Sequence, residues 1–178
     1  MRSHYLGPWR IDLESRDGVP RVVPAAALAR AAAAALEAAR APGPASLGLI
    51  LSDDAELTQL NATHMGKRGA TDVLSFPLLP PEAYPRHAGQ APPAATATPP
   101  FPLPPGIRRH LGDVVVSVER AIDQAKTGRG GQTGDVRWDA HDELRLLVVH
   151  GTLHVCGWDH AESEEEAAMR SLERRLLG

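Results

Sequence analysis

Apolar and polar residues alternate along the chain with two different periods, which predict where helices and strands lie. In the segment 142–155 the apolar residues recur at helical spacing, which indicates a helix with one buried face that ends at Gly157. The buried positions expected there are Leu144, Leu147, Val148 and Leu153. Further helices are predicted at 24–41, 53–61, 119–126 and 163–176, and strands at 46–51, 72–76 and 111–118.

Residues typical of helix ends support these boundaries. Pro24 suits a first helical position. Asp53, with Glu56 three residues later, resembles a capping box, and Ser163 precedes three glutamates that favour a helix N-terminus. A strand followed by a capped helix is typical of layered folds that contain both elements. We therefore expect an α+β fold, in which a small mixed sheet of about four strands packs against about five helices.

One segment has a composition that suits neither a helix nor a strand. Between residues 77 and 105 prolines recur beside Ala, Thr and Gly, and proline removes the backbone N–H that both elements use. We predict a flexible Pro/Ala-rich insertion at 80–106 that lies outside the core. The length of 178 residues fits one domain, so residues 1–178 are expected to form a single domain.

The composition is typical of a soluble globular protein, with 43% hydrophobic residues and a formal net charge of −3. This charge does not by itself indicate an RNA partner. Cys156 is the only cysteine, which excludes an intrachain disulfide and a cysteine-based zinc knuckle and favours a reducing compartment. The first residues contain no signal-peptide core, and the alanine-rich run 25–39 is too weakly apolar to span a membrane. We expect a cytoplasmic protein with no membrane partner.

Three of the eight histidines lie within the segment HGTLHVCGWDH. His150 and His154 are four residues apart, so on a helix their imidazoles project from one face and can bind one ion. His160 follows Gly157, where the chain can reverse direction and bring a third ligand. Three histidines with a fourth position open to water are typical of catalytic zinc sites, whereas structural sites are usually closed and favour cysteine. The segment therefore predicts a catalytic metal site; unrelated surface histidines are the less favoured interpretation.

Three blocks of this sequence resemble those of a known family. HGTLHVCGWDH matches the pattern H-G-x-L-H-x-x-G-[YW]-D-H of the YbeY family of bacterial endoribonucleases at every defined position. LNATHMGKRGATDVLSFP and LGDVVVS resemble two further blocks of that family, and the order of the blocks is the same. The resemblance covers most of the chain after Ser46. The insertion at 80–106 is longer than expected for the family.

The resemblance implies that His150, His154 and His160 bind one Zn²⁺ per chain, on a zincin-like metal helix. It also implies the activity of a single-strand-specific, metal-dependent endoribonuclease, a hydrolase that acts on phosphodiester bonds. The implied roles are 3′-end maturation of small-subunit ribosomal RNA and ribosome quality control. The implied partners are single-stranded RNA, ribosomal RNA and the small ribosomal subunit, and the oligomeric state stays open.

The chain departs from the family pattern in the second block. Where the family has an arginine before Gly-Lys, this chain has Met65, and a thioether cannot hold a phosphate as a guanidinium does. Arg68 stands where the family has an acid, and we hypothesise that it supplies the missing charge. Lys67 and Arg68 are therefore the expected substrate-binding residues. The alternative is that both belong to a solvated loop.

Acidic residues near the predicted ligands are candidates for orienting them. Asp159 is expected to accept a hydrogen bond from the second ring nitrogen of a ligand histidine, although an acid at this place can also be a solvated turn residue. Asp72 and Asp113, at predicted strand ends, are weaker candidates for the same role. Cys156 and Trp158 are expected to be packing residues rather than a ligand and a base-stacking platform.

Two other functions are compatible with a histidine metal site. A metallopeptidase is disfavoured, because the glutamate that follows the first histidine in the H-E-x-x-H helix is replaced here by Gly151. A ribosome-associated metal-binding protein with weak or no catalysis is suggested by Met65. RNA cleavage that is lost in the variant His154→Ala would favour the nuclease over this second alternative.

Overall fold

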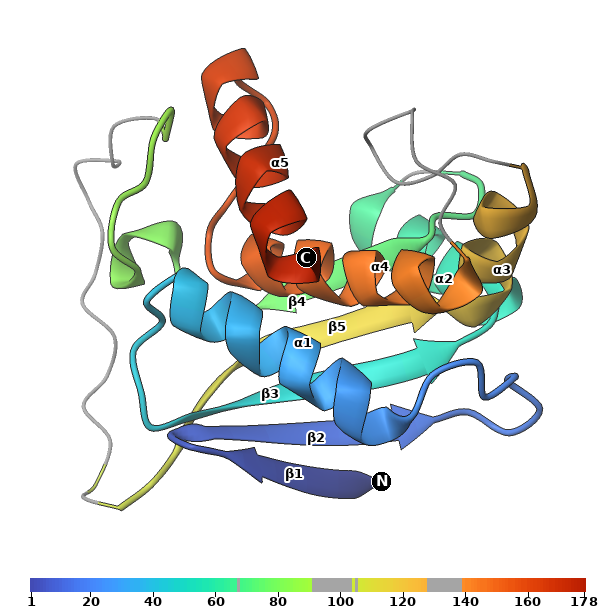
Figure 1. Cartoon of the computed structure of the whole chain (residues 1–178), viewed down its shortest axis with the longest axis horizontal. Helices are drawn as coiled ribbons and strands as arrows, with labels where there is room; N and C mark the ends of the chain where they lie inside the picture. The colour runs from blue at the N-terminus through green and yellow to red at the C-terminus, as the bar shows by residue number, and fades with distance from the viewer. Residues whose placement is uncertain (67, 91–103, 105, 128–138) are drawn as a thin grey trace.

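The computed structural model of the chain describes residues 1–66, 68–90, 104, 106–127 and 139–178. Its strands are β1 (Arg2–Leu6), β2 (Trp9–Ser15), β3 (Ala45–Ser52), β4 (Val73–Pro77) and β5 (Arg109–Ser117). They form one mixed sheet in the order β1-β2-β3-β5-β4 (Figure 1). The strands β2, β3 and β5 are parallel, whereas β1 and β4 each pair antiparallel with their neighbour. β4 is therefore an edge strand.

The helices lie in layers around this sheet (Figure 1). On one face lie α1 (Ala25–Ala38) and α4 (Ala140–Val155), and α5 (Ser163–Leu177) packs against both of these helices. On the other face lies α2 (Asp54–Leu60), which continues into a π-helical turn, η1 (Asn61–Met65). The helix α3 (Val118–Thr127) follows β5 directly and contacts α4. Among the described residues, we find no helix whose length and apolarity would let it cross a membrane.

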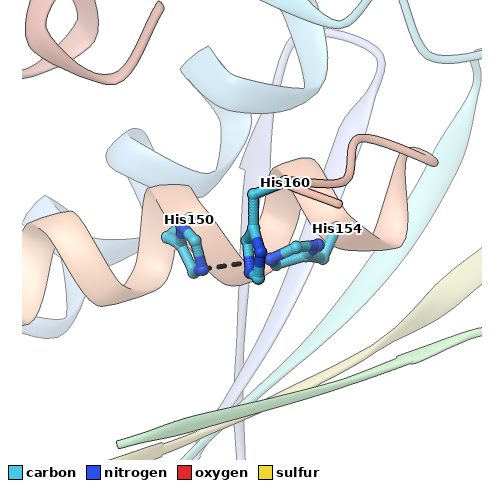
Figure 2. Close-up of side chains that lie close together, drawn as sticks. All are labelled: His150, His154 and His160. Carbon is cyan, nitrogen blue, oxygen red and sulfur yellow. Dashed lines mark hydrogen bonds between the residues drawn. The ribbon is translucent and has the colours of Figure 1, made fainter. Parts of the chain in front are cut away.

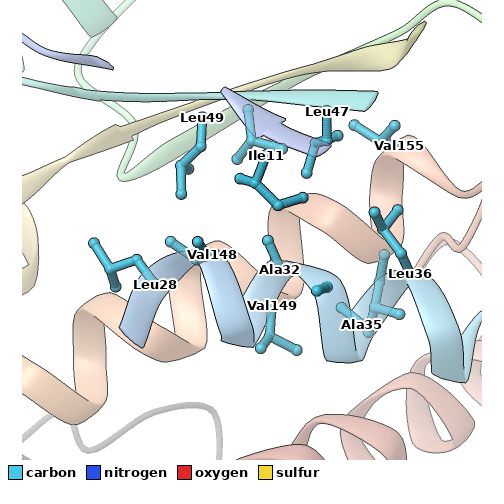
Figure 3. Close-up of a cluster of buried hydrophobic side chains, with 14 of the residues drawn as sticks. Ile11, Leu28, Ala32, Ala35, Leu36, Leu47, Leu49, Val148, Val149 and Val155 are labelled. Carbon is cyan, nitrogen blue, oxygen red and sulfur yellow. The ribbon is translucent and has the colours of Figure 1, made fainter. Parts of the chain in front are cut away.

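Alternate residues of β5 contribute to two different clusters. Val114 and Val116 belong to the main core beneath α1 and α4, whereas Val115 contacts Leu57 and Leu74 on the α2 side. Side chains of a strand alternate between the two faces of a sheet. Val114 and Val116 therefore face α4, whereas Val115 faces α2. The main core includes Ile11, Leu28, Leu36, Leu47, Leu49, Val148 and Val149 (Figure 3).

The predicted α+β fold is confirmed, and within the described residues five α-helices pack with the mixed sheet. The sheet has five strands rather than about four, because residues 2–15 form an antiparallel hairpin that the sequence analysis did not predict. Trp9, Ile11 and Leu13 alternate with polar residues along β2 and are buried. This period of two was the available signal for a strand.

The first residues of the proline-rich insertion are part of the fold. Pro81–Ala83 form a 3₁₀ turn, η2, and Tyr84 is 5% exposed and belongs to the main core. The expectation that the insertion lies outside the core is therefore wrong for these residues, because burial of a tyrosine ring against the core stabilises their packing despite the prolines. Residues 91–103 and 105 of the insertion, and the glycine-rich stretch within 128–138, lie outside the described residues.

Candidate metal centre

Helix α4 places the first two histidines. The carboxylate of Asp139 accepts a hydrogen bond from the backbone N–H of Asp142 at 2.9 Å and caps the start of the helix. The apolar side of α4 is buried against the sheet and α1, so the rotation of the helix about its axis is fixed. His150 and His154, one turn apart, consequently project from the same side (Figure 2).

Gly151 allows α4 to approach the sheet closely. A Cβ atom at this position would lie 2.5 Å from Val114 Cγ1 and 2.9 Å from Val73 Cγ2, well inside the normal separation of packed carbon atoms. The carbonyl of Gly151 also accepts a hydrogen bond from Ser75 Oγ of β4 at 2.9 Å. A glutamate at this position, as in the H-E-x-x-H helix, does not fit this spacing, which counts against a metallopeptidase.

The third histidine returns to the helix through a tight turn. Gly157 adopts a left-handed conformation with φ of 82°, and the backbone N–H of Trp158 bonds the carbonyl of Leu153 at 3.1 Å, which closes the helix end. The ring centroid of His160 then lies 5.1 Å from that of His154 and 5.8 Å from that of the other helical histidine (Figure 2). One ligand nitrogen from each of the three rings lies within 4.8 Å of the other two.

The ring nitrogens of the two helical histidines have a spacing that fits a tetrahedral zinc ion. Zn–N bonds of about 2.0–2.1 Å place two bound nitrogens about 3.3 Å apart, and the Nε2 atoms of His150 and His154 are 3.0 Å apart. The Nδ1 atoms of both rings donate hydrogen bonds to oxygen acceptors, so each neutral ring carries its lone pair on Nε2. Two ring nitrogens that face each other at this distance can share a proton or bind one metal ion.

Each helical histidine is oriented through its second ring nitrogen, as is usual for metal ligands. His150 Nδ1 donates to Glu173 Oε1 of α5 at 2.7 Å, and the Glu173 side chain is 4% exposed. His154 Nδ1 donates to the backbone carbonyl of Trp158 at 2.8 Å. The sequence analysis found neither partner. A signal existed for Glu173, which adjoins Leu172 on the apolar side of α5, where a buried carboxylate requires a partner.

Burial keeps His154 in the neutral form that binds metals. Desolvation lowers the pKa of His154 from its ordinary value of 6.5 to about 4, and the nearby His150 also contributes to this lowering. The hydrogen bond to the carbonyl of Trp158 acts in the opposite direction and is outweighed. A ring that is neutral at pH 7 offers its Nε2 lone pair to a metal without first releasing a proton.

Asp159 lies in the loop 157–160, which carries His160 and is called the ligand loop below, but its contacts differ from those expected. Its carboxylate accepts a hydrogen bond from the backbone N–H of His160 at 2.7 Å, so it holds the loop backbone. The orienting contact to a ligand ring, for which Asp159 was the sequence-based candidate, is made to His150 by Glu173 from α5. Glu173 is distant in sequence, and only the packing of α5 on α4 brings it to His150.

The two other acidic candidates lie on opposite sides of the sheet. Asp72 lines the same cleft as the histidines, and its carboxylate accepts a hydrogen bond from Gln124 of α3 at 3.0 Å. Asp113 is two residues from Val115 along β5 and therefore faces the α2 side, where His110 lies 3.2 Å away. Asp113 thus lies on the face of the sheet away from α4.

The three histidines open into a cleft of about 760 Å³. Its walls are η1 and the residues that follow it, the edge strand β4, and the loop 157–160. Met65 and Arg68 both line the cleft and are exposed. The guanidinium of Arg68 therefore lies in the same cleft as Met65, which stands where the resembled pattern has an arginine. Lys67, the second expected substrate-binding residue, lies outside the described residues.

Cys156 and Trp158 have the packing roles expected from the sequence. Cys156 is buried in the main core, and burial raises the pKa of its thiol to about 12, so it stays protonated. Trp158 is half-buried against the same core and stacks on His87. Neither residue belongs to the group of donor atoms that the three histidines form.

The chain is similar to proteins of one family over nearly its whole length. The family model described as Endoribonuclease YbeY matches residues 15–178, so the likeness begins well before Ser46. The Endoribonuclease YbeY of Thermobifida fusca is 36% identical over 167 residues, which are 94% of this chain and 91% of the relative. That of Roseiflexus castenholzii is 33% identical over 169 residues, covering 94% and 91%. That of Salinispora tropica is 41% identical over 133 residues, covering 75% and 73%.

A solved structure supports the fold. The solution structure of TM1509 from Thermotoga maritima superposes with a TM-score of 0.50 and 21% identity, covering 94% of this chain and 86% of that chain. At this identity the likeness concerns the fold alone. The family model and the relatives, together with the three clustered histidines, lead to one assignment. The chain belongs to the endoribonuclease YbeY family.

Proposed function

We propose that this protein is a metal-dependent endoribonuclease that binds one Zn²⁺ per chain through His150, His154 and His160. The observation that carries the metal assignment is the facing pair of Nε2 atoms, 3.0 Å apart, in rings whose Nδ1 atoms are already bonded to oxygen. The reaction is inferred from the family, whose members are named endoribonucleases.

The side chains around the histidines prepare the centre for hydrolysis. A zinc ion bound there would lower the pKa of a water molecule toward neutrality and polarise a phosphate oxygen. Glu173 and the carbonyl of Trp158 hold the helical imidazoles in one tautomer, so that both Nε2 atoms stay available. Arg68 at the wall of the cleft would offset negative charge on the phosphate. Lys67 is proposed for the same role on the basis of the sequence.

We propose single-stranded RNA as the substrate. A cleft of about 760 Å³ lies in the range of roughly 300–1,000 Å³ that accommodates one small ligand, so it suits a few unpaired nucleotides better than a duplex. The edge strand β4 lines it beside the proposed metal ligands. The finer assignment to 3′-end maturation of small-subunit ribosomal RNA and to ribosome quality control rests on the family resemblance.

Met65 favours one alternative function. Its thioether is 43% exposed in the cleft, where the family resemblance places a phosphate-binding arginine. A chain that lacks this charge can retain the metal and the ribosomal partner while its catalysis is weak. We propose that Arg68 compensates, which distinguishes the nuclease from a metal-binding protein without substantial activity.

Cleavage of a defined RNA tests the proposed function. Zinc-loaded protein is incubated with an end-labelled single-stranded RNA and with the same sequence in a duplex, beside the variants His154→Ala and Arg68→Ala. We expect cleavage of the single strand that is lost in His154→Ala and weakened in Arg68→Ala, because the first variant lacks a metal ligand and the second a phosphate partner.

The variants also separate the alternatives. Zinc binding without cleavage by the wild-type protein would favour the metal-binding protein, and the variant Met65→Arg would then be expected to restore activity. Cleavage that persists in His154→Ala would reveal a contaminating ribonuclease. A protein that retains no zinc would contradict the metal assignment itself.

A further inference from the structure

His87 belongs to the proline-rich insertion, yet it is buried against the loop that follows α4. Its side chain is 6% exposed, and its ring stacks on the indole of Trp158 with centroids 3.8 Å apart and planes inclined by 9°. Its Nε2 donates to Glu165 Oε1 at 2.6 Å, and the Glu165 side chain is 5% exposed. The imidazole therefore links the loop after α4 to the beginning of α5.

Both contacts of His87 end on groups that hold metal ligands in place. The carbonyl of Trp158 accepts the hydrogen bond from His154 Nδ1 at 2.8 Å. The Oε1 atom of Glu165 accepts a second hydrogen bond, from the backbone N–H of Asp159 at 3.0 Å. Asp159 directly precedes His160. His87 therefore contacts Trp158, whose carbonyl holds His154, and Glu165, which holds the backbone just before His160.

The backbone of the same segment is docked tightly at two points. A Cβ atom on Gly89 would lie 2.3 Å from the backbone nitrogen of Glu165, and a Cβ atom on Gly157 would lie 2.9 Å from Pro81 Cα. Both glycines have positive φ, of 76° and 82°. Two close backbone approaches and the His87 contacts hold residues 81–89 against the loop and the start of α5.

We propose that His87 is a positioning residue of the metal centre, and that residues 81–89 form a strap across the ligand loop. The strap fixes Trp158 and Glu165 where they orient His154 and hold the backbone before His160. Without it the loop would sample other positions, so bound zinc would leave faster and its ligand geometry would change. This inference rests on the metal role of the three histidines proposed above.

Zinc release and a cobalt spectrum test the strap directly. The release rate of zinc into excess chelator is measured for the wild-type protein and for His87→Ala, and the visible d–d spectrum of each is recorded with Co²⁺. We expect His87→Ala to release zinc about 10-fold faster or more, as is typical when a support of a metal ligand is lost, and to show a shifted, weaker cobalt band. A merely structural histidine would change neither the cobalt band nor the release rate.

Two conservative variants separate the two contacts of His87. His87→Phe keeps an aromatic ring to stack on Trp158 and removes the donor to Glu165, whereas His87→Gln keeps a donor and removes the stacking. We expect each to recover part of the wild-type release rate relative to His87→Ala. These variants also allow the test if His87→Ala does not fold.

Matched controls distinguish positioning from general stability. Tyr84→Phe alters a buried residue of the same segment whose hydroxyl has no hydrogen-bond partner among the described residues. Ile11→Val removes a methyl group from the core beneath α1, away from the ligand loop, and lowers the melting temperature. We expect wild-type release rates and cobalt spectra for both.

Three outcomes overturn one or other proposal. Wild-type release rates and cobalt spectra in all folded His87 variants would overturn the strap. Equally fast release from Ile11→Val would also overturn it, because metal loss would then follow global stability. A wild-type protein that binds neither Zn²⁺ nor Co²⁺ would instead overturn the proposed metal centre, and this is visible before any variant is made.

Discussion

Helix α4 carries two groups of donor atoms that are close enough to hold an ion, one at each end. The C-terminal group is the proposed metal centre, with two histidines on the helix and one on the following loop. The N-terminal group consists of Asp139, His141 and Asp142. In each of these two groups, found among the described residues, the possible ligand atoms lie within 4.8 Å of one another. Distance alone therefore does not distinguish the two groups, and their surroundings must be compared.

The surroundings differ in burial and in hydrogen bonding. Asp139 uses its carboxylate to cap the helix, through the N–H of Asp142 at 2.9 Å. The side chains of His141 and Asp142 are 41% and 45% exposed, so water competes for their donor atoms. In the metal centre the side chains of His150 and Glu173 are 12% and 4% exposed and bond each other at 2.7 Å.

The comparison shows that closely placed donors do not by themselves make a metal site. The C-terminal group has a hydrogen-bond acceptor for the Nδ1 atom of each helical ring, and these acceptors direct the two Nε2 atoms toward each other. The N-terminal group uses its donors for the helix end and for solvent. Four predictions follow from this difference, in order of decreasing expected effect.

The largest expected difference is in zinc affinity. His154→Ala removes a ligand and should lower zinc affinity by more than ~100-fold, beyond the roughly 10–100-fold effect typical of losing a supporting residue. His141→Ala, at the other end of the same helix, should leave zinc affinity unchanged. Competition with a chelator of known affinity measures both. A larger loss of zinc affinity in His141→Ala than in His154→Ala would place the metal site at the N-terminal end of α4.

Glu173→Gln tests the buried support of His150. The neutral amide is a weaker acceptor for His150 Nδ1, so zinc affinity should fall by about 10-fold or more. Glu166→Gln is the matched control on the same helix, because its carboxylate is 39% exposed and pairs with Arg170. Equal zinc affinity of the Glu173→Gln variant and this control would show that burial of the carboxylate does not matter.

Acidification should destabilise the metal-free protein through His154. The folded protein holds the pKa of His154 near 4 whereas the unfolded chain takes up this proton near 6.5, so stability is complete above pH 6.5 and falls as the pH drops toward 4. The expected loss from this group is about 3 kcal/mol by pH 4. Urea unfolding of the chelator-treated protein between pH 7 and pH 4 measures it. His154→Gln should have a flatter profile, and an equally steep one would assign the loss to other groups.

The smallest expected effect concerns the N-terminal group. Asp139→Ala removes the helix cap and should lower the free energy of unfolding by about 1 kcal/mol, with no change in zinc affinity. Asp139→Asn retains a capping oxygen and should recover most of this loss. Chemical denaturation and zinc competition provide the two measurements. Reduced zinc affinity in Asp139→Ala would indicate that this end of α4 also contributes to metal binding.

Much of the fold was predictable because it depends on local periodicity. The helical spacing of Leu144, Leu147 and Val148 predicted α4, and the capping role of Asp53 is seen in its 2.8 Å hydrogen bond from Glu56 N–H. The hairpin of β1 and β2 was missed although Ile11 and its neighbours alternate with polar residues. Charged residues within that short segment obscured a strand whose stability comes from pairing with β3.

The sequence by itself determined the metal ligands proposed here, because a spacing of four on a helix and a glycine turn bring three histidines together through local geometry. Only the tertiary structure decided what supports them. Glu173 reaches His150 through the packing of α5 on α4, and His87 reaches the ligand loop from a segment whose prolines predicted a flexible insertion. Such contacts join residues far apart along the chain, and burial, which no local pattern encodes, makes them effective.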